Sequence, residues 1–193
     1  MDAKRYERMR TIAEELMERQ DAWAVEIGEG VITIMMSPVN RHELITARLA
    51  RQLRQQIDRD PQWAGYLAHS GPEIDAPAIG RMRRPDLVVL PELALDSPGY
   101  VDPADVALVA EVVSTSNPQN DYAEKTRDYP AMGIPIYLII DPRKKTVTVL
   151  TDPGPAPGDG GHRYRARHDY AFGDTVPVGT WTIDTGEFPA YDG

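Results

Sequence analysis

The stretch Arg83-Arg84-Pro85-Asp86-Leu87-Val88-Val89-Leu90 places a carboxylate directly before an apolar run. The stretch 108–114 (LVAEVVS) carries a second one, Glu111, inside another apolar run, and 121–125 (DYAEK) ends at a lysine soon afterwards. A carboxylate in an apolar strand is costly unless it is paired or binds a cation. Two such carboxylates followed by Lys125 therefore indicate a metal site of the kind that cleaves phosphodiesters.

The two apolar runs predict strands over 86–90 and 107–113, the second buried on both faces. If these strands pair side by side, Asp86 and Glu111 reach one point at the end of the sheet. Hard oxygen ligands suit Mg²⁺ or Mn²⁺, and the backbone carbonyl of Val112 could add a ligand. The alternative is that Asp86 is a turn residue that begins its strand and that Glu111 pairs with a buried arginine.

Lys125 follows Asp121 by four residues, so the two project from one face of a predicted helix. The lysine could orient the attacking water and offset charge in the transition state. An ordinary surface pair between Asp121 and Lys125 is the alternative. Tyr129, one turn later, could lie beside the lysine or donate to a phosphate, or it could be a core tyrosine.

A predicted helix over 41–58 opens with His42 and Glu43. His42 shares a face with Ile45 and Leu49, which predicts that it points toward the core. Glu43 could add a carboxylate to a metal site or stabilise the helix N-terminus. We take His42, Glu43, Asp121 and Tyr129 as accessory candidates.

Hydrophobic periodicity predicts one mixed α/β domain over 1–193, built around a central sheet. Pro130 predicts a kink or an early end of the helix that starts at Asp121, near Tyr129. Residues 71–77 and 151–161 are predicted as loops. The predicted elements are helix 2–19, a hairpin with arms 23–27 and 31–36 around turn 28–30, helix 41–58, strands 63–69, 86–90, 107–113, 134–140 and 146–150, and two or three strands within 164–183.

The composition excludes several classes of protein and of metal site. Of the 193 residues none is a cysteine, which excludes a disulfide scaffold and thiolate metal sites. The first residues lead into a charged amphipathic segment, and no window approaches 18 apolar residues. We therefore expect no membrane partner and a cytoplasmic protein.

The chain resembles the bacterial "putative restriction endonuclease" family of the PD-(D/E)xK nuclease superfamily. The resemblance rests on order and spacing over roughly 20–185, a core preceded by the N-terminal helix 1–19. Its motifs are 25–38 (VEIGEGVITIMMSP) with His42, 84–89 (RPDLVV), 111–114 (EVVS), 121–125 (DYAEK) with Tyr129, and 133–142 (GIPIYLIIDP).

This resemblance implies a restriction-endonuclease-like fold, a central mixed sheet flanked by helices, and Mg²⁺-dependent hydrolysis of DNA. It implies that Asp86 and Glu111 take the places of the motif's acidic residues. The superfamily's usual lysine position, two after the glutamate, is Val113 here, so Lys125 on the following helix takes that role. His42 matches the family's histidine at the start of a helix.

The net charge of −9 argues against a nuclease, because nucleic-acid binding draws most of its affinity from cations that face phosphates. Arginines gather at 41–54, 81–84 and 163–167, and each group could be only a solvated face. We expect Arg83 or Arg84 to contact the phosphate backbone. Two hypotheses follow: a Mg²⁺-dependent DNA endonuclease, with a homodimer as one option, or a catalytically inactive binding or interaction module of the same fold.

Overall fold

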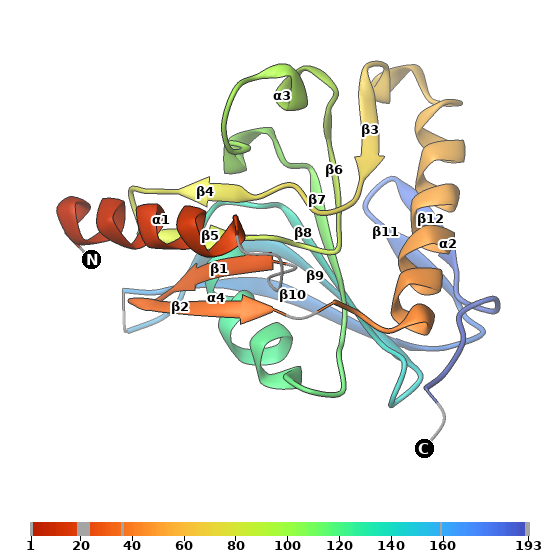
Figure 1. Cartoon of the computed structure of the whole chain (residues 1–193). Coiled ribbons are helices and arrows are strands. Elements are labelled where there is room, and N and C mark those ends of the chain that lie inside the picture. The colour runs from red at the N-terminus through yellow and green to blue at the C-terminus, as the bar shows by residue number, and fades with distance from the viewer. Residues whose placement is uncertain (1, 19–23, 36, 159, 192–193) are drawn as a thin grey trace.

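A central six-stranded sheet organises the molecule (Figure 1). The computed structural model describes residues 2–18, 24–35, 37–158 and 160–191. One neighbouring pair, β7 and β8, is parallel and the other pairs are antiparallel, so the predicted mixed sheet is confirmed. The strand order is β10 (His162–Ala171), β9 (Thr146–Pro155), β8 (Ile136–Asp141), β7 (Leu108–Val112), β6 (Leu87–Pro91) and β3 (Tyr66–His69).

A second, smaller sheet carries the N-terminal hairpin. Its order is β2 (Val31–Met35), β1 (Ala24–Gly28), β5 (Arg81–Arg83) and β4 (Ile74–Ala76). The hairpin turn contains only Glu29 and Gly30, whose φ of 83° suits glycine. Helix α1 (Ala3–Met17) packs Tyr6, Met9 and Ala13 against this sheet. Arg19, Trp23 and Met36, the predicted ends of these elements, lie outside the described residues.

Helix α2 (Asn40–Ile57) covers one face of the central sheet together with the hairpin of β11 (Thr175–Val178) and β12 (Trp181–Asp184). Its predicted inward residues are all buried: Ile45, Leu49, Leu53 and Ile57. They pack against strand residues such as Leu108 and Ala110. The 3.6-residue spacing thus predicted this apolar face correctly.

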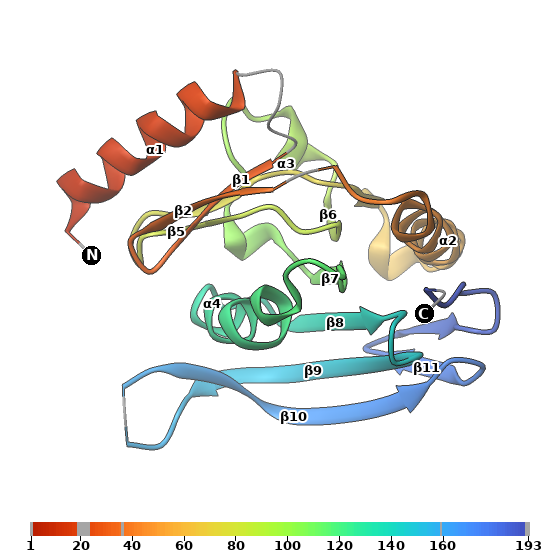
Figure 2. The ribbon, with the colours of Figure 1, turned by 60° about the horizontal axis from the view of Figure 1, so that its bottom comes forward.

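Helix α4 (Lys125–Ala131) lies between the small sheet and strands β8–β10 (Figure 2). A π-helical turn, Asn120–Glu124, precedes it. Pro130 stays inside the helix, which ends at Ala131, two residues beyond the predicted point. Gly133 then exits with a φ of 79°.

Three loop or strand predictions were wrong in part. The segment 71–77 contains β4, which pairs with the unexpected β5. The segment 151–161 was predicted as a loop, but β9 continues to Pro155. Beyond Thr151, β9 pairs with β10 alone, so its prolines face an unpaired side and are tolerated. The strand predicted from Trp63 begins at Tyr66, after the short 3₁₀ turn Pro61–Trp63.

The turn-rich connection after β6 holds the short helix α3 (Leu93–Asp96) and the 3₁₀ turn Pro103–Asp105. Among the helices that the structure describes, none is long and apolar enough to cross a membrane.

Candidate active site

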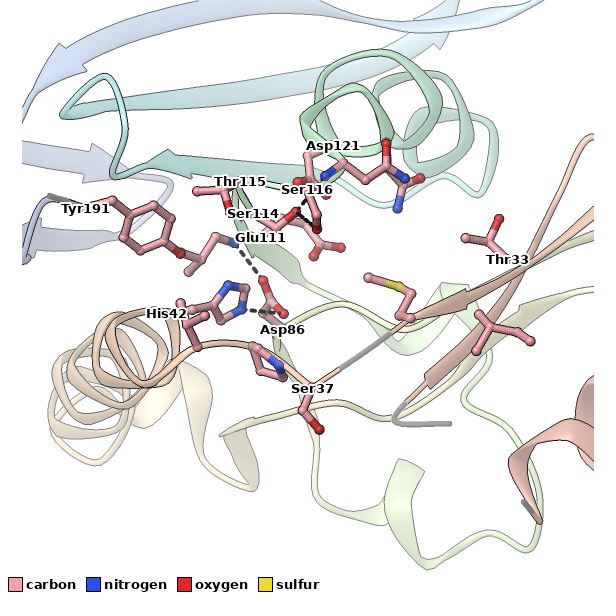
Figure 3. Close-up of a pocket in the computed structure, with 17 residues that line it drawn as sticks. Thr33, Ser37, His42, Asp86, Glu111, Ser114, Thr115, Ser116, Asp121 and Tyr191 are labelled. Carbon is pink, nitrogen blue, oxygen red and sulfur yellow. Dashed lines mark hydrogen bonds and ion pairs between the residues drawn. The ribbon is translucent and has the colours of Figure 1, made fainter. Parts of the chain in front are cut away.

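A cavity of about 220 Å³ opens at the edge of the central sheet where β6 begins and β7 ends (Figure 3). It lies between the start of α2, strand β2, the segment after β7 and the C-terminal segment. Carboxylates, hydroxyls and amides supply its polar lining. The described lining residues are Thr33, Ile34, Met35, Ser37, Pro38, Val39, His42, Asp86, Glu111, Val112, Ser114, Thr115, Ser116, Asn117, Asn120, Asp121 and Tyr191.

Asp86 and Glu111 lie side by side at this cavity. The pairing of β6 with β7 matches Leu87 with Ala110, which brings Asp86 next to the Glu111 position. Both side chains are nearly buried, with 9% and 2% of the residue exposed. Oδ2 of Asp86 accepts a hydrogen bond of 2.7 Å from the backbone N–H of Val112. The condition set by the sequence analysis, that the two strands pair side by side, is therefore met, and the pairing gathers the two predicted carboxylates.

His42, in the first turn of α2, fixes the other oxygen of Asp86. Its Nε2 lies 2.9 Å from Oδ1 of Asp86, and the residue is buried as predicted. Burial opposes the charged imidazole, but the hydrogen bond and the charge of Asp86 outweigh it and raise the pKa of His42. Glu43 is exposed and lines a smaller neighbouring hollow with Arg84 and Asp86.

Glu111 points toward α4, because alternate residues of β7 face opposite sides of the sheet. The Tyr129 hydroxyl donates to Oε1 of Glu111, and Nζ of Lys125 lies 2.8 Å from the same oxygen. Burial raises the pKa of Glu111 well above its ordinary value; Lys125 opposes this, and the charges of Asp86 and Asp121 add to it. Burial is thus the main cause of the shift, and Lys125 is the nearest charge that favours the ionised form.

The π-helical turn before α4 turns Asn120, Asp121 and Lys125 inward together. Nζ of Lys125 lies 3.4 Å from Asp121 and 3.3 Å from Glu26 on β1. We call Glu26, Glu111, Asp121 and Lys125 the carboxylate–lysine cluster. Burial opposes the charge of Lys125, but these carboxylates raise its pKa well above the ordinary value.

Lys125 lies behind the cavity wall. It is fully buried, whereas its partners Glu111 and Asp121 line the cavity. The alternative of an exposed Asp–Lys surface pair is thus excluded. Burial raises the pKa of Asp121 to about 6, against the opposing charge of Lys125.

The structure contradicts the predicted phosphate contact of Arg83. Only 1% of this residue is exposed, because its guanidinium lies between Glu26, at 2.9 Å, and Asp128. The buried arginine therefore pairs with Glu26, and Glu111 pairs with a lysine instead. Arg84 is partly exposed, and its Nη1 lies 3.2 Å from Glu73.

Sequence reasoning assigned no role to Glu26, although the same argument that singled out Glu111 applies to it. It sits inside the apolar strand β1 and is completely buried. Burial opposes ionisation, but Lys125 and Arg83 outweigh it and lower the pKa of Glu26. A carboxylate within an apolar run was the available indication.

Tyr191 was also missed, and no pattern in the sequence marks it. It points into the cavity from the C-terminal segment (Figure 3). Its hydroxyl oxygen is buried and has no hydrogen-bond partner among the described residues. Burial, with the charge of Asp86 adding to it, raises the pKa of Tyr191 to about 12, so the hydroxyl keeps its proton and can donate.

The donor set fits a hard divalent cation held by few protein ligands. Within the described ranges, no group of three or more His, Cys, Asp or Glu side chains is arranged to hold a metal ion. Mg²⁺ commonly uses one or two carboxylates and completes its shell with water and substrate phosphates. Asp86 and Glu111, with the carbonyl of Val112, match that mode better than the closed shell of a structural zinc site.

Comparison with known proteins decides the family. The Uma2 family, described as "Putative restriction endonuclease", matches residues 5–178. The chain belongs to the Uma2 family. This membership confirms the resemblance seen in the sequence, and family and fold together support a nuclease function.

A solved structure agrees with this fold. A crystal structure described as "a putative nuclease belonging to DUF820", from Anabaena variabilis ATCC 29413, superposes with a TM-score of 0.67 at 16% identity. The match covers 91% of this chain and 96% of the other. At that identity the likeness establishes the fold alone. No curated protein matches the chain.

Proposed function

We propose that this Uma2 protein is a Mg²⁺-dependent endonuclease that hydrolyses DNA phosphodiester bonds. One observation carries the proposal. Asp86 and Glu111 lie side by side on the cavity, and Nζ of the buried Lys125 lies 2.8 Å from Oε1 of Glu111. Family membership adds support for a nuclease. Mg²⁺ dependence, DNA as substrate, a homodimer that cuts both strands and a cytoplasmic location are predictions of this proposal.

In this proposal Asp86, Glu111 and the carbonyl of Val112 hold the ion. The bound ion would polarise the scissile phosphate and lower the pKa of a water molecule. His42 and the Val112 N–H orient Asp86 through one hydrogen bond or ion pair to each oxygen. Each carboxylate oxygen has two lone pairs, so these contacts leave capacity for a cation.

In this proposal Lys125 acts through Glu111 and Asp121, the two carboxylates of the cavity lining that it contacts. Its charge opposes the rise that burial causes in the pKa of Glu111 and Asp121, and so favours the ionised form that a metal ligand requires. Its positive charge also lies close to the position where the transition state gains negative charge. Tyr129 holds the Glu111 carboxylate in one orientation. The Tyr191 hydroxyl donates to a substrate oxygen, and Arg84 replaces Arg83 as the predicted phosphate contact.

The alternative is a non-catalytic interaction module. It is favoured by the net charge of −9 and by the lining of the cavity, which has no lysine or arginine among its described residues. Such a module would keep the fold and the buried ion pairs without cleaving a phosphodiester.

Incubation with supercoiled plasmid separates the two. The wild type, Lys125→Met and Glu111→Gln would each be tested with Mg²⁺ and with EDTA. Glu15→Ala, an exposed change on α1, is the control. The proposal predicts Mg²⁺-dependent nicking by wild type and control that both site variants lose. Absence of nicking by the wild type on DNA, or nicking that survives both site variants, would contradict it.

A further inference from the structure

The turn between β8 and β9 contains Arg143, Lys144 and Lys145, the only three consecutive basic residues in the sequence. The chain as a whole carries a net charge of −9. Figure 2 shows this turn, between β8 and β9, at one end of the central sheet. The turn is therefore a local positive site on an acidic protein.

The turn lies at the edge of the candidate active site. The backbone N–H of Tyr191 donates to the carbonyl of Pro142 at 3.1 Å. Tyr191 itself lines the cavity that contains Asp86 and Glu111. One residue thus connects the turn to the cavity, and a long ligand that enters the cavity would pass close to the turn.

A buried carboxylate fixes the first cation of the turn. Asp141 is fully buried, and its two oxygens accept from Nε and Nη2 of Arg143 at 2.9 and 2.7 Å. The Tyr122 hydroxyl donates to the same carboxylate at 2.9 Å. This bidentate pair holds the arginine in one geometry and neutralises one positive charge of the turn.

The two lysines remain available to a ligand. Nζ of Lys144 lies 3.9 Å from Oδ2 of Asp141 and 4.6 Å from the centre of the Tyr122 ring, and 62% of the side chain is exposed. Lys145 is exposed, and no ion pair engages it among the described residues. Together they present more positive charge than Asp141 balances.

Several arginines of the other basic groups are already engaged. On α2, Arg51 pairs with Glu187 and Arg41 donates to the carbonyl of Ala190, so these side chains hold the C-terminal segment. On β10, Arg165 pairs with Asp152, and Arg167 pairs with Asp169. The described cavity lining contains no lysine or arginine. A polyanion at this cavity would need positive charge from its edge.

We propose that Lys144 and Lys145, positioned by the anchored Arg143, bind backbone phosphates of the DNA that flank the cavity. The proposal rests on DNA being the substrate, as inferred above. Ammonium groups contact phosphates as point charges without reading sequence, so this surface would set position and affinity.

Fluorescence anisotropy with a short labelled DNA duplex in EDTA tests the surface without requiring cleavage. The double variant Lys144→Ala/Lys145→Ala is compared with Lys4→Ala/Arg8→Ala on α1, which removes the same charge from a helix that does not line the cavity. We expect the Kd of the first to rise about tenfold. The slope of log Kd against log salt should fall by about 2, and the control should keep the wild-type slope.

Equal affinities for wild type and both double variants would overturn the proposal, as would a wild type that does not bind DNA. Lysine-dependent binding to an RNA duplex but not to DNA would overturn the choice of DNA. If the lysines control DNA binding but the plasmid stays intact in Mg²⁺, the surface stands and the nuclease proposal falls. If the wild type nicks plasmid but both double variants bind DNA as the wild type does, the nuclease proposal stands and the proposed surface falls.

Discussion

The two faces of the central sheet differ in what they bury. The α2 face is filled by aliphatic side chains such as Leu49, Leu53 and Leu108. The α4 face buries an apolar group around Val109 and, beside it, the carboxylate–lysine cluster. One strand, β7, supplies both. The comparison teaches that strand alternation places aliphatic side chains of β7 on one face of the sheet and the ionisable Glu111 on the other.

The consequence is a difference in how the faces tolerate change. An aliphatic face loses stability in proportion to the contacts removed and the cavity left behind. A buried charge cluster loses stability because the partners left behind remain charged and unpaired. The following variants test this contrast, starting with the largest expected effect.

Glu26→Ala should be the most destabilising change, because it leaves Lys125 and Arg83 without a shared buried partner. We expect a loss of about 3–5 kcal/mol in the free energy of unfolding at neutral pH. Urea titration followed by circular dichroism measures it. A loss below about 1 kcal/mol would mean that the cluster does not support the fold.

Glu26→Gln keeps the size of the side chain and gives a pH test. Lys125 and Arg83 lower the pKa of Glu26 from its ordinary value of 4.5, against burial. The carboxylate therefore stabilises the fold fully above this pH, and the benefit is lost as pH falls through the lowered pKa. The stability gap between wild type and Glu26→Gln should narrow below about pH 4.5. A gap that stays constant there would contradict the charge assignment.

Leu49→Ala represents the aliphatic face. Leu49 is fully buried, so we expect a loss of about 2–5 kcal/mol in the free energy of unfolding. Because Leu49 itself does not line the cavity, the folded fraction should keep the wild-type nicking rate. A specific loss of nicking in folded protein would break the division between the two faces.

Tyr191→Phe should have the smallest effect on stability and the opposite sign. The hydroxyl is buried without a partner among the described residues, so its removal should leave stability unchanged or slightly higher. If it donates to a charged substrate oxygen, nicking should slow by about tenfold or more. The matched change Tyr66→Phe, outside the cavity lining, should leave the rate unchanged. Equal rates for Tyr191→Phe and wild type would exclude a substrate contact.

The sequence predicted correctly those elements in which the spacing of apolar residues matches the side chains that are buried in the fold. Leu49 and Leu53 repeat at helical spacing, and Glu111 stands out because a charge inside an apolar strand requires a partner. The identity of that partner depends on which distant element folds against the strand. This is why Arg83 was predicted to contact phosphate although Glu26 on β1 and Asp128 on α4 enclose it.

Other features had no local pattern to reveal them. The π-helical turn adds one residue to a helical turn, and the side-chain sequence of Asn120–Glu124 does not distinguish it from an α-helix. Tyr191 reaches the cavity because Arg41 and the carbonyl of Pro142 hold the C-terminal segment, which is a tertiary effect. The strands β4 and β5 are only three residues each, too short for alternation to be recognised.

Titration calorimetry with Mn²⁺ tests the paired carboxylates most directly. Wild type, Asp86→Ala, Glu111→Ala and the remote control Glu15→Ala would be compared under identical conditions, after their folding is checked by circular dichroism. If Asp86 and Glu111 hold the ion, wild type and control bind Mn²⁺ with the same isotherm and both site variants give no binding. Identical isotherms for all four proteins would show that these two carboxylates do not form the metal site.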